Sequence, residues 1–186
     1  MGMPLSSRRW TPSQVLALPA DGNRYECIDG ELLVTPSPRL AHQRALRALY
    51  DELGNYVRRE ELGDLFWSPA DIEIEPDTLV QPDLFVAGAA PGAARLQEWS
   101  EITHLRLAIE VLSPGTARYD RGLKRRFYQR AGVDEYWIVD LDARLVERWR
   151  PADDRPEICA DVLDWAPDGA SEPLRVELSA IFAALD

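Results

Sequence analysis

Residues 105–112 read Leu-Arg-Leu-Ala-Ile-Glu-Val-Leu, an apolar run that carries one carboxylate, Glu110. A run of this length that ends at Ser113-Pro114-Gly115 is typical of a buried β-strand. A carboxylate between Ile and Val is costly to bury without a partner, so Glu110 must meet either a cation such as an arginine or a metal ion. The stretch therefore predicts a buried strand of a sheet and a place where chemistry is concentrated.

The preceding strand is predicted at residues 79–86, Leu-Val-Gln-Pro-Asp-Leu-Phe-Val. Pro82 cannot donate to a β-ladder, so Asp83 is expected at an edge, a bulge or an irregular start of the pairing. An aspartate in so apolar a run needs hydrogen bonds or a metal ion. Neighbouring strands would bring Asp83 and Glu110 together.

Residues 117–131 after the second strand are predicted to form a helix, closed by Gly132. Asp120, Lys124 and Tyr128 recur at i, i+4 and i+8, so they share one face. Lys124 is the single lysine beside twenty arginines. Arginine stays charged near neutral pH, whereas a lysine can be tuned to exchange protons with water. The single lysine is thus a functional clue, although one leftover lysine must fall somewhere.

The same helix is rich in arginine, and we predict that Arg118, Arg121 and Arg125 contact nucleic acid. A solvated helix face is an equally good interpretation of such a run. The formal net charge of −11 argues against a surface coated with phosphate-binding groups. A local basic site remains compatible with that charge.

The rest of the chain predicts one α/β domain over residues 1–186, of the α+β type, with a mixed sheet flanked by helices. Its parts are an N-terminal helix and hairpin (10–35), a core (36–150) and a C-terminal extension (151–186). The hairpin turns at Asp29-Gly30. A long helix is expected from Ser37-Pro38, with Ser37 as its cap. Further predictions are a helix start at Thr11-Pro12, strands at 71–75, 135–140 and 144–149, a flexible loop at 87–94 and a small helix at 178–182.

Composition also bounds the function. No apolar run approaches the roughly 20 residues needed to cross a bilayer, and the N-terminus lacks the apolar core of a secretory signal. Cys27 and Cys159 lack the spacing of a metal site, and with two histidines in the chain a zinc site is not expected. We expect a cytoplasmic protein with reduced cysteines. Any metal would be held by carboxylates, as Mg²⁺ or Mn²⁺ is.

Several of these segments together resemble the Uma-two family, described as "putative restriction endonucleases", within the PD-(D/E)XK nuclease superfamily. The resemblance covers roughly residues 10 to 182. It is carried by Pro82-Asp83, by Ile109-Glu110-Val111-Leu112-Ser113-Pro114, by residues 119–124, by Tyr128, by residues 132–140, and upstream by Tyr25-Glu26, residues 28–32 and His42-Gln43.

The resemblance implies a restriction-endonuclease-like core and metal-dependent cleavage of DNA. It implies that Asp83 and Glu110 bind the metal. The superfamily's lysine is expected two residues after the glutamate, where this chain has Leu112, and the resemblance suggests that Lys124 replaces it. Glu31 and His42 match family positions that could line the same site, although His42 could equally be a surface histidine. Asp120 could position Lys124 or only cap the helix.

These observations lead to two hypotheses from different classes, and a third, an RNA or branched-DNA nuclease, differs from the first only in its substrate. The first is a Mg²⁺- or Mn²⁺-dependent endonuclease in which Asp83 and Glu110 hold the ion and Lys124 assists the attacking water. The second is a catalytically inactive binding or assembly module that keeps the nuclease fold. A homodimer is expected because cutting a duplex often uses two sites, and Trp137, Trp149 and the C-terminal strands are candidates for an exposed interface.

Overall fold

A mixed sheet of six strands forms the middle layer of the computed structural model, which describes residues 9–88 and 96–185. The predicted loop at 87–94 falls largely outside these residues. The strands lie in the order β3-β4-β5-β6-β7-β8, and among these neighbours β5 and β6 run parallel while the others pair antiparallel. Their bounds are β3 Asp64–Trp67, β4 Leu84–Ala87, β5 Leu105–Val111, β6 Glu135–Asp140, β7 Leu145–Trp149 and β8 Glu157–Cys159.

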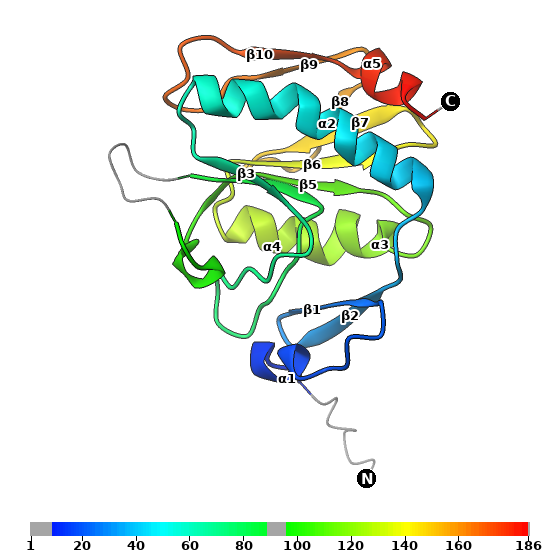
Figure 1. Cartoon of the computed structure of the whole chain (residues 1–186), viewed down its shortest axis with the longest axis vertical. Coiled ribbons are helices and arrows are strands. Elements are labelled where there is room, and N and C mark those ends of the chain that lie inside the picture. The colour runs from blue at the N-terminus through cyan, green and yellow to red at the C-terminus, as the bar shows by residue number, and fades with distance from the viewer. Residues whose placement is uncertain (1–8, 89–95, 186) are drawn as a thin grey trace.

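One face of the sheet is covered by the connection between the parallel strands β5 and β6. It consists of α3 (Ala117–Tyr119), a π-helical turn η2 (Asp120–Lys124) and α4 (Arg125–Arg130). The predicted helix is therefore helical over nearly its whole length, but a wider turn interrupts it at Lys124. The N-terminal hairpin, with β1 (Arg24–Ile28) and β2 (Glu31–Thr35), lies at the same side (Figure 1).

The other face is covered by α2 (Leu40–Arg59) together with the C-terminal elements (Figure 1). These are a two-stranded sheet of β9 (Val162–Trp165) and β10 (Leu174–Glu177), and α5 (Leu178–Ala183). Two short helices complete the fold, α1 (Pro12–Leu16) and the 3₁₀ turn η1 (Trp99–Glu101). Within the described residues, no helix is long and apolar enough to cross a membrane.

Side chains of β5 alternate between the two layers, as those of any strand do. Leu107, Ile109 and Val111 join the apolar cluster under α2, whereas Ala108 joins the cluster that contains residues of α4. Glu110 lies two residues after Ala108 and therefore on the same face of the strand. Its carboxylate points toward the crossover helices α3, η2 and α4. This alternation is what positions the site.

Two sequence-based predictions of local structure are confirmed in detail. Thr11 caps α1 in a capping box with Gln14, and Pro12 occupies the first turn. Asp29 and Gly30 form the hairpin turn, both with positive φ, and β1 pairs with β2 on either side of them. Local chemistry decides both features, which is why the sequence alone predicts them.

Other predictions are wrong, each for a tertiary reason. Helix α2 begins at Leu40 rather than Pro38, with Arg39 at the cap position, and the Ser37 hydroxyl instead donates to the carbonyl of Gly22. Residues 71–75 form no strand, and Ile72 makes only an isolated bridge to Val80.

The predicted strand over 79–86 shortens to β4, which begins after Pro82 and Asp83. Trp137 and Trp149 are buried, so they cannot form an exposed interface. Strand β3 was not predicted.

Gly63 opens β3 at a point where two backbones come close together. Its φ is +120°, and a side chain there would collide with the backbone carbonyl of Ala87. Only glycine tolerates both conditions.

Candidate active site

Lys124 lies at the centre of a buried group of ionisable side chains. Its ammonium is 2.8 Å from Glu110 Oε1 and 2.9 Å from Glu26 Oε1, and the lysine side chain is 2% exposed. Glu110 comes from β5, Glu26 from β1 and Lys124 from the π-helical turn. Three segments far apart in the sequence thus meet at one nitrogen atom.

Asp83 reaches the same group from the other side of Glu110. The ladder pairs Leu84 with Ile109, so the same register continued outward by one residue sets Asp83 opposite Glu110. Asp83 Oδ2 accepts a hydrogen bond of 2.9 Å from the backbone N–H of Val111. The Asp83 side chain therefore extends the pairing beyond the point where Pro82 ends it.

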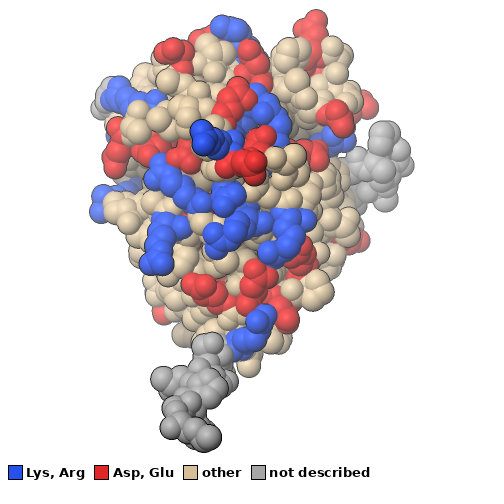
Figure 2. Space-filling model, turned by 180° about the vertical axis from the view of Figure 1, so that it is seen from behind, with Lys and Arg blue, Asp and Glu red and all other residues tan. Residues whose placement is uncertain are grey.

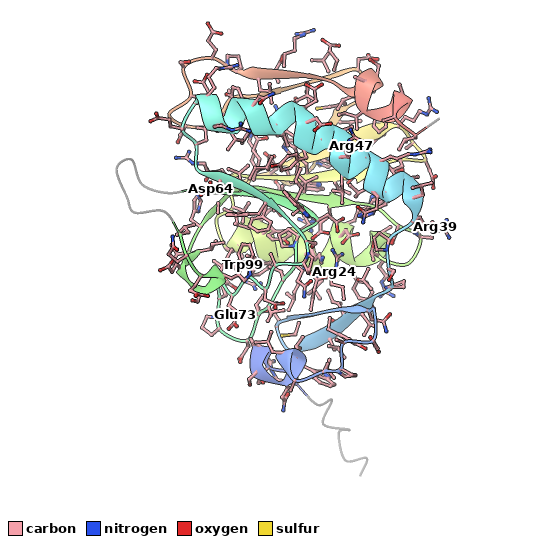
Figure 3. The ribbon with its side chains drawn as sticks, viewed as in Figure 1. Arg24, Arg39, Arg47, Asp64, Glu73 and Trp99 are labelled. Atoms are coloured by element: carbon pink, nitrogen blue, oxygen red, sulfur yellow. The ribbon has the colours of Figure 1, made fainter. Side chains whose placement is uncertain are left out.

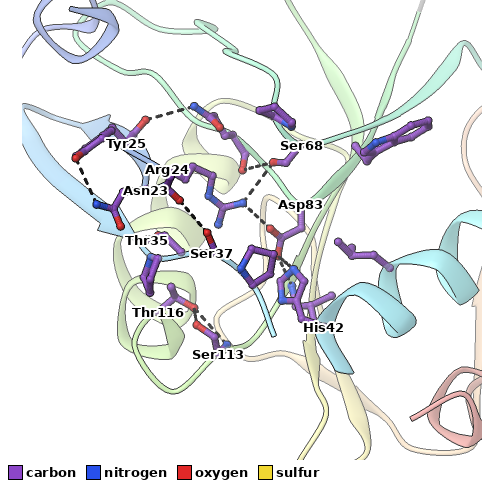
Figure 4. A pocket seen from close by; sticks show the side chains of 18 of the residues that line it. Asn23, Arg24, Tyr25, Thr35, Ser37, His42, Ser68, Asp83, Ser113 and Thr116 are labelled. Atoms are coloured by element: carbon purple, nitrogen blue, oxygen red, sulfur yellow. Dashed lines mark hydrogen bonds and ion pairs between the residues drawn. The ribbon is translucent and has the colours of Figure 1, made fainter. Parts of the chain in front are cut away.

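Arg24 links the carboxylates. Its Nη1 lies 2.5 Å from Asp83 Oδ1 (Figure 4). Its Nη2 lies 3.8 Å from Glu110 Oε2, and its Nε lies 3.6 Å from Glu26 Oε2. Nη1 also donates to the hydroxyl of Ser68. One guanidinium thus faces three carboxylates, and Figure 3 places it between the sheet and the hairpin.

Three further side chains surround this group. His42 Nε2, from α2, lies 3.4 Å from Asp83 Oδ2. The hydroxyl of Tyr128, from α4, donates to Glu110 Oε1 at 3.3 Å. Asp120 is buried, and its Oδ1 lies 3.9 Å from the Lys124 ammonium, too far for a hydrogen bond. Asp120 thus adds negative charge near Lys124 without fixing its position.

Burial and neighbouring charges give the carboxyl groups of the site different pKa values. Burial alone would raise the pKa of Asp83, but the hydrogen bond from His42 and the charge of Arg24 hold that pKa well below its usual range. Burial raises the pKa of Glu110 well above its usual range, against the attraction of Lys124. Burial likewise raises the pKa of Asp120 to about 6. Asp83 is therefore the firm anion of the group.

Lys124 keeps its proton in this environment. Burial lowers the pKa of a lysine, but the charges of Glu110 and Glu26 more than offset that effect and raise the pKa of Lys124 above its ordinary value. The group is an ammonium near neutral pH. It can donate hydrogen bonds and stabilise negative charge, but it is not poised to act as a base.

A cavity of about 890 Å³ opens onto one side of this group (Figure 4). Of the described site residues, Arg24, His42 and Asp83 line it, whereas Glu110 and Lys124 do not. The walls come from α2, from the N-terminal hairpin and from the segments that follow β3 and β5. A ligand in the cavity would thus meet Asp83 and Arg24 first.

Glu31, predicted to line the site, lies elsewhere, and the arginines predicted to contact nucleic acid belong to the crossover between β5 and β6. Glu31 is exposed next to the hairpin turn, and its backbone pairs with Ile28. Arg118 is exposed on α3. Arg121 pairs with Asp140 at 2.7 Å and with Glu147 at 2.6 Å.

Arg125 already has partners within the fold. Its guanidinium lies over the ring of Trp149 and donates to Gln129. Figure 2 shows basic side chains gathered in a band across one face, with acidic side chains above and below it.

Sequence reasoning did not assign Arg24 and Glu26 to the site. Glu26 is fully buried, and besides Lys124 it accepts the backbone N–H of Gln81 at 2.8 Å. A signal was present, because Glu26 lies between Tyr25 and Cys27 in a strand, as Glu110 lies between two apolar residues. Which way the hairpin docks is a long-range property that no local pattern encodes.

Comparison with known proteins identifies the chain. The family model Uma2, described as "Putative restriction endonuclease", matches residues 12–173. The chain belongs to the Uma2 family. No curated protein matches its sequence.

Solved structures share the fold of this Uma2 chain, and one of them illustrates the likeness. It is described as "a putative nuclease belonging to DUF820 from Anabaena variabilis ATCC 29413". The two chains are 21% identical and superimpose with a TM-score of 0.74, over 95% of this chain and 99% of the other. The predicted family and the predicted mixed sheet with flanking helices are both confirmed.

Proposed function

We propose that this Uma2 protein is a divalent-metal-dependent endonuclease that hydrolyses phosphodiester bonds of DNA at the group around Lys124. The observation that carries the proposal is the meeting of Asp83, Glu110 and Lys124 beside a cavity. The family and the solved neighbour are both described as nucleases, which supports a nuclease-like function.

The side chains suit a hard divalent ion by chemical type. Carboxylate oxygens are the donors that Mg²⁺ and Mn²⁺ prefer. Two buried carboxylate oxygens, Glu26 Oε2 and Asp120 Oδ1, have no hydrogen-bond partner, so the group has spare acceptor capacity. Among residues 9–88 and 96–185, no three His, Cys, Asp or Glu side chains are gathered as metal ligands. In this arrangement Arg24 and Lys124 contact the carboxylates that would hold the ion.

Asp83 and Glu110 would hold the ion once Arg24 releases Asp83. A bound Mg²⁺ supplies Lewis-acid stabilisation of the phosphate and a more acidic water. Lys124 orients the attacking water and stabilises the negative charge that develops on the phosphate, because its ammonium donates hydrogen bonds in a buried setting. Asp83, the strongest acid of the group, remains the carboxylate with full negative charge.

Arg24 has a second role in this proposal. Its guanidinium reaches into the cavity and is matched to planar or forked oxygen pairs. In the complex the guanidinium moves from Asp83 to oxygens of the substrate phosphate. The divalent ion then replaces it as the positive charge next to Asp83.

The occupancy of Asp83 by Arg24 also favours a second candidate function. Arg24 and Lys124 already neutralise much of the buried negative charge, so the group is stable without a metal ion. This is what we expect of a catalytically inactive member of the fold. Such a protein would be a binding or assembly module.

Cleavage assays with variants test the proposal. Plasmid and linear DNA are incubated with Mg²⁺ or Mn²⁺ and with wild-type protein, Asp83→Asn, Lys124→Ala or the control Asp142→Asn, which changes an exposed aspartate. We expect wild type and Asp142→Asn to cut, and the two site variants to lose at least about a hundredfold in rate. Cleavage that survives both site variants would show that the activity comes from elsewhere.

Calorimetry with Mn²⁺ separates the two candidates. The endonuclease proposal expects binding heat that Asp83→Asn removes while the protein stays folded by circular dichroism. Absence of both heat and cleavage in the wild type would favour the inactive module.

A further inference from the structure

Trp67 presents a large apolar surface directly beside Asp83. It is the last residue of β3, an edge strand of the sheet, and its backbone lies opposite Leu84. The next residue, Ser68, donates its backbone N–H to the carbonyl of Asp83 at 3.2 Å. The indole lines the cavity although Trp67 is 57% exposed. Trp67 and the candidate catalytic carboxylate of Asp83 therefore line one cavity.

The indole is held in place without being covered. Tyr50, from α2, packs against it edge to face, with ring centroids 5.0 Å apart and planes at 88°. Trp99 offers a contrast on the same sheet, because its ring packs against both Phe66 and Phe85. Core packing accounts for the position of Trp99. It does not account for a tryptophan whose ring is braced at one edge and open to solvent.

Arginine outnumbers aspartate among the residues that line the cavity, although the whole chain is acidic. Three arginines line it, Arg24, Arg39 and Arg47, against two aspartates, Asp71 and Asp83. Arg39 is exposed where the chain enters α2, and Figure 3 shows Arg39 and Arg47 along the α2 side. In a protein of net charge −11, a cavity with an excess of arginine is suited to a phosphate chain.

The depth of the site selects among nucleic acids. The Asp83 side chain is 4% exposed, and Glu110 and Lys124 lie behind it. In a duplex the complementary strand accompanies each phosphate, so a buried carboxylate is hard to reach without unpairing. A single strand can enter a cavity and turn its bases onto an aromatic side chain. Stacking is also largely independent of base sequence, since every base has a flat face.

We infer that the cavity binds an unpaired nucleic-acid strand, with one base stacked on Trp67 and the adjoining phosphate held by Arg24 next to Asp83. The inference rests on the proposed nuclease function for the fate of that phosphate. The binding itself depends only on Trp67 and the arginines. An enzyme of this kind acts on single strands, flaps or unpaired junctions in preference to continuous duplex.

Binding measured without cleavage tests the inference. Fluorescein-labelled oligo(dT), oligo(rU), a flapped duplex and a blunt duplex of equal length are titrated with protein in EDTA, and anisotropy is recorded. The variants are Trp67→Ala, Trp67→Phe and the control Trp99→Ala, a partly exposed tryptophan outside this cavity. The two homopolymer arms show which sugar is accepted.

We expect at least tenfold tighter binding of single-stranded or flapped probes than of blunt duplex. Trp67→Ala should weaken single-strand binding by roughly 5- to 150-fold, while Trp67→Phe and Trp99→Ala stay within about threefold of wild type. Because Trp67→Phe keeps a stacking ring, its retained affinity would separate lost stacking from lost folding.

Equal affinity for duplex and single strand, or unchanged affinity in Trp67→Ala, would overturn the inference. Light scattering adds one more outcome: a dimer that Trp67→Ala dissociates would assign this face to a second copy of the chain and would also overturn it. Cleavage of duplex DNA that does not depend on Trp67 would support the proposed nuclease function and overturn the single-strand inference. Single-strand binding without any cleavage would support the inference and refute the proposed nuclease function.

Discussion

Replacement of Lys124 by methionine tests the central physical claim about this site. Methionine keeps most of the length and volume of the side chain and removes its charge. The ammonium is 2% exposed and lies within 2.9 Å of Glu110 and Glu26, so both carboxylates lose a buried cation. Removing one partner of a buried ion pair typically costs about 3–5 kcal/mol, because the remaining charge stays buried. We expect a loss of about 3 kcal/mol or more in the free energy of unfolding.

The free energies of unfolding are measured by urea denaturation, followed by tryptophan fluorescence and by circular dichroism. Arg47→Met is the matched control, since it also replaces a cation by methionine. Arg47 is 84% exposed and lies 3.7 Å from Asp51 in an i, i+4 pair. Such a pair contributes about 0.3–0.5 kcal/mol, so the control should unfold almost as wild type does.

A second substitution checks the cause of the loss. Glu26→Gln in the Lys124→Met background removes one of the two buried carboxylates that have lost their cation. It should restore about 1 kcal/mol or more of the free energy of unfolding. A loss below about 1 kcal/mol in Lys124→Met alone would refute the reasoning, because it would mean that water or protonation relieves the carboxylates. Equal losses in Lys124→Met and Arg47→Met would refute it as well.

Three further predictions concern separate features. Asp120 has a pKa of about 6 against an ordinary value of 3.8, so the stability due to its neutral form is complete below about pH 4 and is lost as pH rises through 6. Asp120→Asn should therefore be more stable than wild type by up to about 3 kcal/mol at pH 8 and nearly equal to it at pH 4; a gap that does not vary with pH would contradict this. Arg24→Gln frees Asp83, and calorimetry should show Mn²⁺ binding about tenfold tighter than in wild type, whereas weaker binding would mean that Arg24 supports the ion. Gly63→Ala should lower the free energy of unfolding by about 2 kcal/mol or more in urea titrations, because φ is +120° and the new methyl group meets the carbonyl of Ala87; a neutral result would mean that β3 shifts freely.

Local patterns were sufficient for the part of the site that lies on β5 and beside it. The isolated Glu110 in an apolar strand and Asp83 after Pro82 predict two adjacent carboxylates, and the structure brings them together through Arg24. Spacing also predicts that Lys124 and Tyr128 share a face, and both reach Glu110. The catalytic role of these residues remains a prediction.

Long-range docking explains what the sequence could not predict. Arg24 and Glu26 enter the site only because the N-terminal hairpin packs beside the crossover helices. The alternation of residues 71–75 looks like a strand, but no partner strand is available there beyond the bridge from Ile72 to Val80. Ser37 is a good cap by type, yet its hydroxyl contacts the distant Gly22 carbonyl and the helix begins only at Leu40. In each case a contact distant in sequence outweighs the local preference.

The meeting of Glu26 with Lys124 has a consequence for synthesis of the chain. The hairpin leaves the ribosome early, but its buried glutamate has no ammonium to pair with until about a hundred further residues are made. At roughly 5–20 residues per second, that wait is about 5–20 s. During it, β1 and β2 can form their own ladder, since their pairing is local. The pairing of Glu26 with Lys124 must follow translation of the crossover, so the hairpin forms early but reaches its final position only after β5 and the crossover have been made.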